Sequence, residues 1–124
     1  LVSLLPSTPE TRGMVDAALL KALRRDGPFG APVFVNAGRG DAVNEPDLVA
    51  ALTDGTLRAA SLDVFPVEPL PATSPFWSMP NVVVTPHNAA DSHPDAVAAT
   101  VMEEIRRFEA GEPPLNPVDR SRGY

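Results

Sequence analysis

The sequence predicts an α/β fold with a parallel sheet, and three features indicate this class. Short runs of β-branched and aromatic residues recur along the 124-residue chain. Stretches with leucine, valine and alanine at helical spacing separate these runs. Each run ends in a loop rich in glycine or proline. Strands that alternate with helices in this way are typical of βαβ units, whose strands lie parallel in one sheet.

Local signals set the boundaries of the expected elements. Pro6 ends the first strand, because proline has no N–H to donate to a ladder. Asp16 is a suitable cap for the first helix, and Pro46 suits the first turn of the second. Ser92 and Gly111 are typical of the start and the end of the last helix. We expect strands over residues 1–5, 33–36, 59–65 and 81–85, and helices over residues 17–25, 46–52 and 93–110.

Two further segments have neither strand nor helix character. The proline-rich stretch over residues 70–80 carries Phe76 and Trp77, which we expect to pack in the core as anchors. The tail after Gly111 contains several prolines, and we expect it to run over the surface.

Composition and charge exclude several classes of protein. The net charge of −6 argues against a nucleic-acid-binding surface or an anionic-membrane-binding surface. The absence of cysteine excludes disulfides and thiolate metal sites. No apolar run reaches the ~18 residues needed to cross a bilayer, and the start has no signal-peptide pattern, so we expect a cytoplasmic protein. Because the chain opens directly as a strand without an initiator methionine, we expect it to be a piece of a longer protein.

A glycine-flanked arginine follows the strand at residues 33–36. Gly38 and Gly40 have no side chains, which would allow the backbone to pass close to a ligand. Arg39 between them carries a planar fork of donors that suits a carboxylate or a phosphate. The pattern therefore predicts an anion site, although an ordinary surface arginine in a turn has the same local sequence.

Arg39, Glu68 and His87 each follow a different predicted strand. The carboxyl ends of parallel strands meet at one edge of an open α/β sheet, where ligands bind. An imidazole beside a carboxylate is a recognisable acid–base pair, because the carboxylate fixes the tautomer and favours the imidazolium. We therefore expect a proton donor with an anion clamp nearby, while each residue taken alone also fits a structural or solvated role.

Other chemistries find little support in the sequence. His87 and His93 are the only histidines, and they do not form a metal-binding His-Glu-x-x-His pattern, so we expect no metal. No serine nucleophile elbow and no phosphate-binding Gly-x-x-x-x-Gly-Lys sequence is present, which disfavours hydrolases and nucleoside triphosphatases.

Four ordered segments resemble the NAD(P)-dependent D-2-hydroxyacid dehydrogenases. They cover residues 4–11 (LLPSTPET), 36–40 (NAGRG), 62–70 (LDVFPVEPL) and 85–87 (TPH). Three further segments are similar to the glyoxylate/hydroxypyruvate reductase branch, namely residues 76–77, 86–90 and 119–124. The resemblance implies a Rossmann-type fold, with residues 1–110 as the second half of an NAD(P)-binding domain and residues 111–124 as a C-terminal tail. It also implies a homodimer.

The resemblance implies a reaction and a role for each candidate residue. A small 2-keto acid would be reduced to the 2-hydroxy acid by NADPH or NADH. Arg39 would bind the substrate carboxylate, His87 would donate the proton, and Glu68 would keep His87 protonated. The implied cofactor-binding residues are Pro6, Thr8, Ala37, Gly38, Arg39, Asp63, His87, Asn88, Ala89 and Ala90.

Two alternatives to an active reductase stay open. A dinucleotide-sensing interaction protein would use the same fold without catalysis, although it needs no acid–base pair. The chain by itself would also be an inactive fragment, because the Gly-x-Gly-x-x-Gly turn that binds a pyrophosphate is absent from it. We therefore expect weak cofactor binding and very low turnover for the 124 residues alone.

Overall fold

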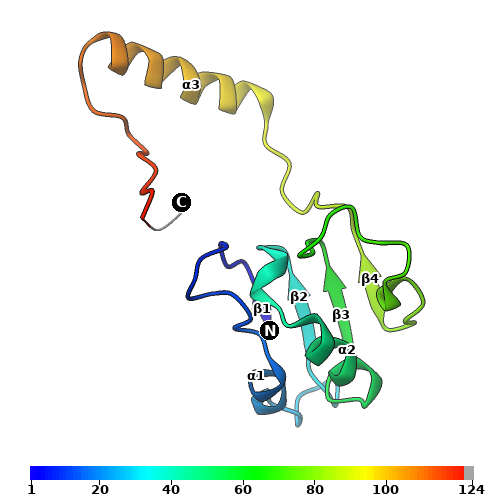
Figure 1. Cartoon of the computed structure of the whole chain (residues 1–124). Helices are drawn as coiled ribbons and strands as arrows, with labels where there is room; N and C mark the ends of the chain where they lie inside the picture. The colour runs from blue at the N-terminus through cyan, green and yellow to red at the C-terminus, as the bar shows by residue number, and fades with distance from the viewer. Residues whose placement is uncertain (122–124) are drawn as a thin grey trace. The chain divides into compact units, whose positions relative to one another are not determined.

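The computed structural model describes residues 1–121 and contains one four-stranded parallel sheet. Its strands lie side by side in chain order, β1-β2-β3-β4 (Figure 1). Neighbouring strands are in parallel register, with Val35 opposite Val2 and Ser61 in the first two pairs. The strands are β1 (Val2–Ser3), β2 (Val33–Asn36), β3 (Ala59–Leu62) and β4 (Val82–Val84). The predicted α/β class and parallel sheet are confirmed.

The described chain divides into two compact units. The first unit, residues 1–89, holds the sheet, and the second begins at Ala90 and holds the last helix. The β3–β4 connection has only a 3₁₀ turn instead of an α-helix. The helices are α1 (Ala17–Ala22), α2 (Glu45–Thr53) and α3 (Pro94–Glu109), and the 3₁₀ turns are η1 (Gly40–Ala42) and η2 (Pro75–Trp77).

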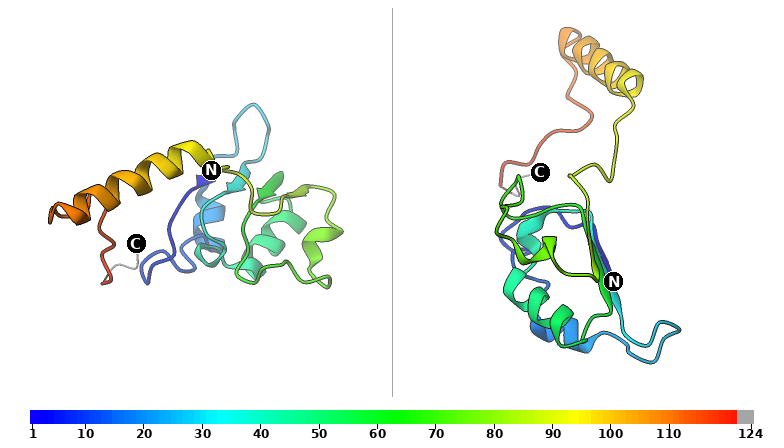
Figure 2. Two further views of the ribbon diagram at one scale, coloured as in Figure 1. Left: turned by 90° about the horizontal axis from the view of Figure 1, so that it is seen from above. Right: turned by 90° about the vertical axis from the view of Figure 1, so that its right-hand side faces the viewer.

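The core of the first unit lies between the sheet and α1 and α2, which cover the same face (Figure 2). Burial alternates along β2, where Phe34 and Asn36 face the helices and are buried while Val33 and Val35 are half-buried. On the edge strand β4, Val83 is 59% exposed. The face of the sheet that α1 and α2 cover is therefore buried, whereas residues of the other face are partly exposed within the first unit.

Most predicted boundaries differ from the structure by one or more residues, with β1 shortened to Val2–Ser3, and three differences have a clear local cause. Helix α1 ends at Ala22 because Leu23 takes an extended conformation, in which it still packs against the core. Strand β3 ends at Leu62, and Phe65 turns inward to become buried. Ser92 does not cap α3, since the capping position is His93, whose side chain makes no capping bond.

The aromatic pair in the proline-rich stretch divides between core and surface. Phe76 is 2% exposed and packs against Phe65, with 6.1 Å between the ring centroids. Trp77 is 56% exposed and donates its indole N–H to the carbonyl of Pro71 at 3.0 Å. The expectation of two core anchors is thus confirmed for Phe76 and wrong for Trp77, because consecutive residues of a short 3₁₀ turn point in different directions.

Helix α3 presents an apolar stripe and has no buried residue. The stripe consists of Val97, Val101, Ile105 and Phe108, and all four side chains are exposed. Within residues 1–121, no helix is both long enough and apolar enough to span a membrane.

Gly38 and Gly40 are needed for contacts within the protein. A Cβ atom on Gly38 would lie 2.6 Å from the backbone of Leu5, and one on Gly40 would lie 1.9 Å from the backbone of Phe65. These glycines therefore have a structural reason within the protein, and their role in the close approach of a ligand stays a prediction. They allow the loop around Arg39 to pack between the segments that follow β1 and β3.

We predict that Gly40→Ala destabilises the first unit by about 3 kcal/mol or more, because the new methyl group meets backbone that has no room to move. Gly27→Ala is the matched control, since nothing lies within 4 Å of its added Cβ, and its effect should stay within about 1 kcal/mol. Urea unfolding followed by Trp77 fluorescence measures both. Equal stability of the two variants would contradict this account of Gly40.

Candidate active site

The loop that carries Arg39 is held by the buried side chain of Asn36. Its Oδ1 accepts the N–H of Gly38 at 3.2 Å, and its Nδ2 donates to the carbonyl of Arg39 at 3.2 Å. The exposed guanidinium of Arg39 donates to the Gly38 carbonyl at 2.8 Å. Within residues 1–121 no ion pair joins Arg39 to an acid. Its positive charge is therefore available to an anion from outside the chain.

A second set of contacts ties the loop after β1 to the Arg39 loop. Asp41 accepts the hydroxyl of Ser7 at 2.5 Å and pairs with Arg12 at 3.3 Å. Thr8 is buried, and its hydroxyl and N–H both contact the hydroxyl of Thr11. The side chain of Thr8 thus supports its own loop, and its predicted contact with a cofactor ribose stays a prediction.

Glu68 and His87 form the acid–base pair that the sequence predicts. Nδ1 of His87 lies 2.8 Å from Oε2 of Glu68, and both side chains are partly exposed. The other oxygen, Oε1, accepts the N–H of Phe65 at 2.8 Å, which fixes the carboxylate. The hydrogen bond from His87, followed by the one from Phe65, holds the pKa of Glu68 below its usual value of 4.5. Glu68 is therefore a charged acceptor that orients the ring, leaving Nε2 of His87 to face a reactant.

Asp63 lies at the end of β3 and is 6% exposed. Its carboxylate accepts the hydroxyl of Thr85 and the N–H groups of Asn88 and Ala89, the last two at 3.0 Å each. Burial by itself raises the pKa of Asp63, but these hydrogen bonds outweigh it and lower the pKa below 3.8. Asp63 is thus a buried anion held by donors from the segment around His87.

A hollow of about 700 Å³ opens beside the Glu68–His87 pair. Its floor and walls include Phe65, Trp77 and Val84, while Glu68 and His87 lie on its lining. Asp63 also lies on the lining, so the site combines apolar surface with three titratable groups, as small-molecule sites commonly combine apolar and polar groups.

The residues present fit the nicotinamide end of a dinucleotide. Oδ2 of Asp63 accepts one hydrogen bond and has capacity for a second, which suits an amide donor. The loops after β1 and β2 lie together, with the N–H of Ala37 donating to the carbonyl of Ser3 at 3.1 Å. The sequence has no Gly-x-Gly-x-x-Gly turn for the pyrophosphate. Within residues 1–121, no group of three or more acidic or histidine side chains could hold a metal ion.

The structure brings some of the predicted residues into contact and leaves others apart. Glu68 joins His87, and Asp63 joins Asn88 and Ala89, whereas the side chain of Arg39 makes no hydrogen bond to either set among residues 1–121. Sequence reasoning overlooked Asn36 and Thr85, which hold the Arg39 loop and Asp63. An amide residue directly before a turn was a usable signal for Asn36, because such side chains bond to nearby backbone. Thr85 offered no comparable signal.

The parallel sheet, with an acid–base pair in the loops at its carboxyl edge, defines a dinucleotide-binding type of α/β domain. Residues 1–89 match the model of the "D-isomer specific 2-hydroxyacid dehydrogenase, NAD binding domain". The chain therefore belongs to the family of D-isomer specific 2-hydroxyacid dehydrogenases.

Relatives of known name are similar over the whole chain. Glyoxylate/hydroxypyruvate reductase A of Escherichia fergusonii is 47% identical over 124 residues. The crystal structure of the NADPH-dependent glyoxylate/hydroxypyruvate reductase of Sinorhizobium meliloti, in complex with NADP and sulfate, is 55% identical, with a TM-score of 0.95 over 100% of this chain. A D-isomer specific 2-hydroxyacid dehydrogenase of Xanthobacter autotrophicus Py2, in complex with NADPH and MES, is 51% identical, with a TM-score of 0.89 over 99% of this chain.

The chain spans only part of each relative. It covers 38% of the Escherichia fergusonii enzyme, 39% of the Sinorhizobium meliloti chain and 49% of the Xanthobacter autotrophicus chain. The similarity therefore establishes the family and the fold of the nucleotide-binding part.

We predict that the ionised carboxylate of Asp63 stabilises the first unit at neutral pH and that this contribution to the free energy of unfolding is lost in acid. Its folded pKa lies below the unfolded value of about 3.9, so its hydrogen bonds stabilise the folded state above that pH, and this contribution is lost as pH falls through the folded pKa. Asp63→Asn should therefore be less stable than the unaltered chain at pH 7, and the gap should narrow below about pH 4.

Urea unfolding between pH 7 and pH 2 measures this gap. The exposed Asp91 supplies the control, since Asp91→Asn should follow the unaltered chain throughout. A gap for Asp63→Asn that stays constant over the whole pH range would show that its ionised form is not what the donors stabilise.

Proposed function

We propose that this chain is the catalytic part of an NADPH- or NADH-dependent reductase of a small 2-keto acid such as glyoxylate or hydroxypyruvate. The observation that carries the proposal is the 2.8 Å contact between His87 and Glu68 at the carboxyl edge of the sheet. The named relatives support the substrate class, since they are called glyoxylate/hydroxypyruvate reductases. NADP and NADPH in the related crystal structures favour NADPH as the cofactor.

Each residue of the site has a defined task in this proposal. The guanidinium of Arg39 binds the carboxylate of the keto acid through paired hydrogen bonds and draws charge from its carbonyl oxygen. His87 delivers a proton to that oxygen from Nε2, while Glu68 holds the ring through Nδ1. The reduced nicotinamide supplies the hydride when it is bound. The segments around Ala37 and Asp63 and the residues from Asn88 to Ala90 would hold its ring, and those around Pro6 and Thr8 would lie near its ribose.

The remaining parts of the proposal follow from the sequence patterns and from the family resemblance. A homodimer and a cytoplasmic location belong to it, as does the division into a nucleotide-binding part over residues 1–110 and a tail over residues 111–124. The similar tail segment at residues 119–124 extends into residues 122–124, which lie outside the described residues.

We predict that His87→Gln and Arg39→Ala each lower kcat/KM of the complete enzyme by about 10²-fold or more. Gln cannot supply the proton, and Ala lacks the guanidinium that binds the substrate carboxylate. The measurement is nicotinamide oxidation with glyoxylate and with hydroxypyruvate at saturating NADPH or NADH.

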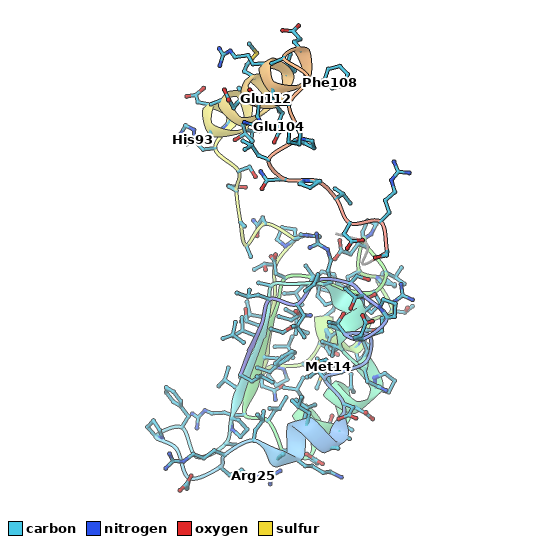
Figure 3. All side chains as sticks on the ribbon, turned by 90° about the vertical axis from the view of Figure 1, so that its left-hand side faces the viewer. Met14, Arg25, His93, Glu104, Phe108 and Glu112 are labelled. Atoms are coloured by element: carbon cyan, nitrogen blue, oxygen red, sulfur yellow. The ribbon has the colours of Figure 1, made fainter. Side chains whose placement is uncertain are left out.

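Two matched substitutions control for the loss of an arginine charge and of an imidazole ring. His93 precedes α3 at its capping position, and Arg25 lies beyond α1 at the end of the sheet opposite the site (Figure 3). His93→Gln and Arg25→Ala should therefore stay within about twofold of the unaltered enzyme. If the enzyme binds the cofactor and reduces no 2-keto acid, the proposal fails and a dinucleotide sensor becomes the better account.

We also predict that the 124-residue chain alone binds NADPH with a Kd weaker than about 100 μM, because the sequence has no pyrophosphate-binding glycine turn. Titration calorimetry measures this Kd directly. Binding in the low micromolar range would mean that the nicotinamide end of the site supplies most of the affinity.

A further inference from the structure

Asp63 contacts residues on both sides of His87. Its Oδ1 accepts the hydroxyl of Thr85 and the N–H of Asn88, and its Oδ2 accepts the N–H of Ala89. The donors come from the segment that follows β4, whereas Asp63 follows β3. The backbones of the two segments are also in register here, since the N–H of Thr85 donates to the carbonyl of Leu62 at 3.0 Å. A single buried carboxylate therefore anchors three donors around the proton-donating residue.

The backbone at His87 needs such an anchor. Its φ of 54° lies in the left-handed region, and within residues 1–121 no other non-glycine residue has a positive φ. Side chains other than glycine adopt this conformation only where the surrounding structure holds them in it. The two N–H groups after His87 and the hydroxyl before it are held by Asp63, so both sides of the strained residue are fixed.

We propose that Asp63 is a positioning residue for His87, because its carboxylate clamps the segment from Thr85 to Ala89 and so turns the imidazole toward Glu68. The clamp is a property of this chain, and its consequence for catalysis rests on the proposed function. The role goes beyond the contact with the nicotinamide amide that the family resemblance implies for Asp63.

The clamp acts on the imidazole through backbone geometry. Without it, residue 87 relaxes toward negative φ, which rotates the Cα–Cβ bond and moves Nδ1 away from Oε2 of Glu68. Glu68 then loses the hydrogen bond that contributes most to its low pKa. The direct field of Asp63 acts on Glu68 in the opposite sense, because like charges disfavour ionisation. The two effects therefore have opposite signs and are separable by experiment.

The first test uses the 124-residue chain without cofactor. Asp63→Asn replaces one acceptor oxygen by a donor, and Thr85→Val removes a hydroxyl while leaving the carboxylate intact. Titration of the Glu68 side-chain carboxyl by ¹³C NMR should show a midpoint that moves up toward 4.5 in Asp63→Asn and, by a smaller amount, in Thr85→Val. Amide hydrogen exchange at Asn88 and Ala89 should become about tenfold faster or more in Asp63→Asn.

Two further variants make this test specific. Thr85→Ser restores the hydroxyl and should return the Glu68 midpoint to that of the unaltered chain. Thr53→Val removes a hydroxyl from α2 that donates to the Val49 carbonyl, and should change neither readout. A Glu68 midpoint that falls or stays constant in Asp63→Asn would overturn the proposal. It would show that Asp63 acts on Glu68 only through the repulsion between the two negative charges. If Asp63→Asn does not fold, Thr85→Val and its Ser rescue decide the question alone.

The second test concerns the complete enzyme. Thr85→Val should lower kcat about tenfold while the Kd of the reduced cofactor changes by less than about threefold, because Oδ2 of Asp63 keeps its environment. An unchanged kcat with a weakened cofactor Kd would overturn the catalytic role of the clamp. If the unaltered enzyme reduces no 2-keto acid, the proposed function fails, and the Glu68 titration still decides whether the clamp exists.

Discussion

Parallel pairing of β2, β3 and β4 is the constraint on which the site depends. The pairing continues one residue past the strands, where the N–H of Asp63 donates to the carbonyl of Asn36 and that of Thr85 donates to the carbonyl of Leu62. These two bonds align the starts of the loops that follow β2, β3 and β4. Glu68 and His87, far apart in the chain, meet because their loops start at the same edge of the sheet.

Close backbone contact is the second requirement of the site. Gly38 and Gly40 touch the segments after β1 and β3, so the Arg39 loop fills the space between its neighbours. Asn36 then fixes the same loop from within the core. The backbone of Arg39 is thus held in place, although its side chain is exposed. Because the loop is already ordered, less conformational entropy is lost when an anion binds.

Local charge at the site differs from the charge of the whole chain. The net charge is −6, yet Arg39 has no acidic partner within residues 1–121. The acids of the site are occupied, because Glu68 is taken by His87 and Phe65, and Asp63 by the segment around His87. An incoming carboxylate therefore meets one available cation and two carboxylates whose charge is already hydrogen-bonded. Under the proposed function, this arrangement would allow an acidic chain to bind the carboxylate of its substrate.

The sequence by itself determined the α/β class, the order of the elements and the three residues expected at the strand ends. It could do so because hydrophobic periodicity, turn residues and strand ends are local properties of the chain. The boundaries of α1 and β3 were less accessible, since Leu23 and Phe65 leave their elements to reach the core. Trp77 was misjudged because the pattern of a proline-rich stretch does not indicate which side of a short turn faces inward.

Only the tertiary structure decided how the site is held together. The functions of Gly38, Gly40 and Asn36 depend on which segments pass beside them, and no local pattern contains that information. The same holds for Asp63 and Thr85, whose hydrogen bond joins two strands through a contact between residues far apart in the chain. Residue identity therefore specified the chemistry available to this protein, and long-range packing specified which groups meet to perform it.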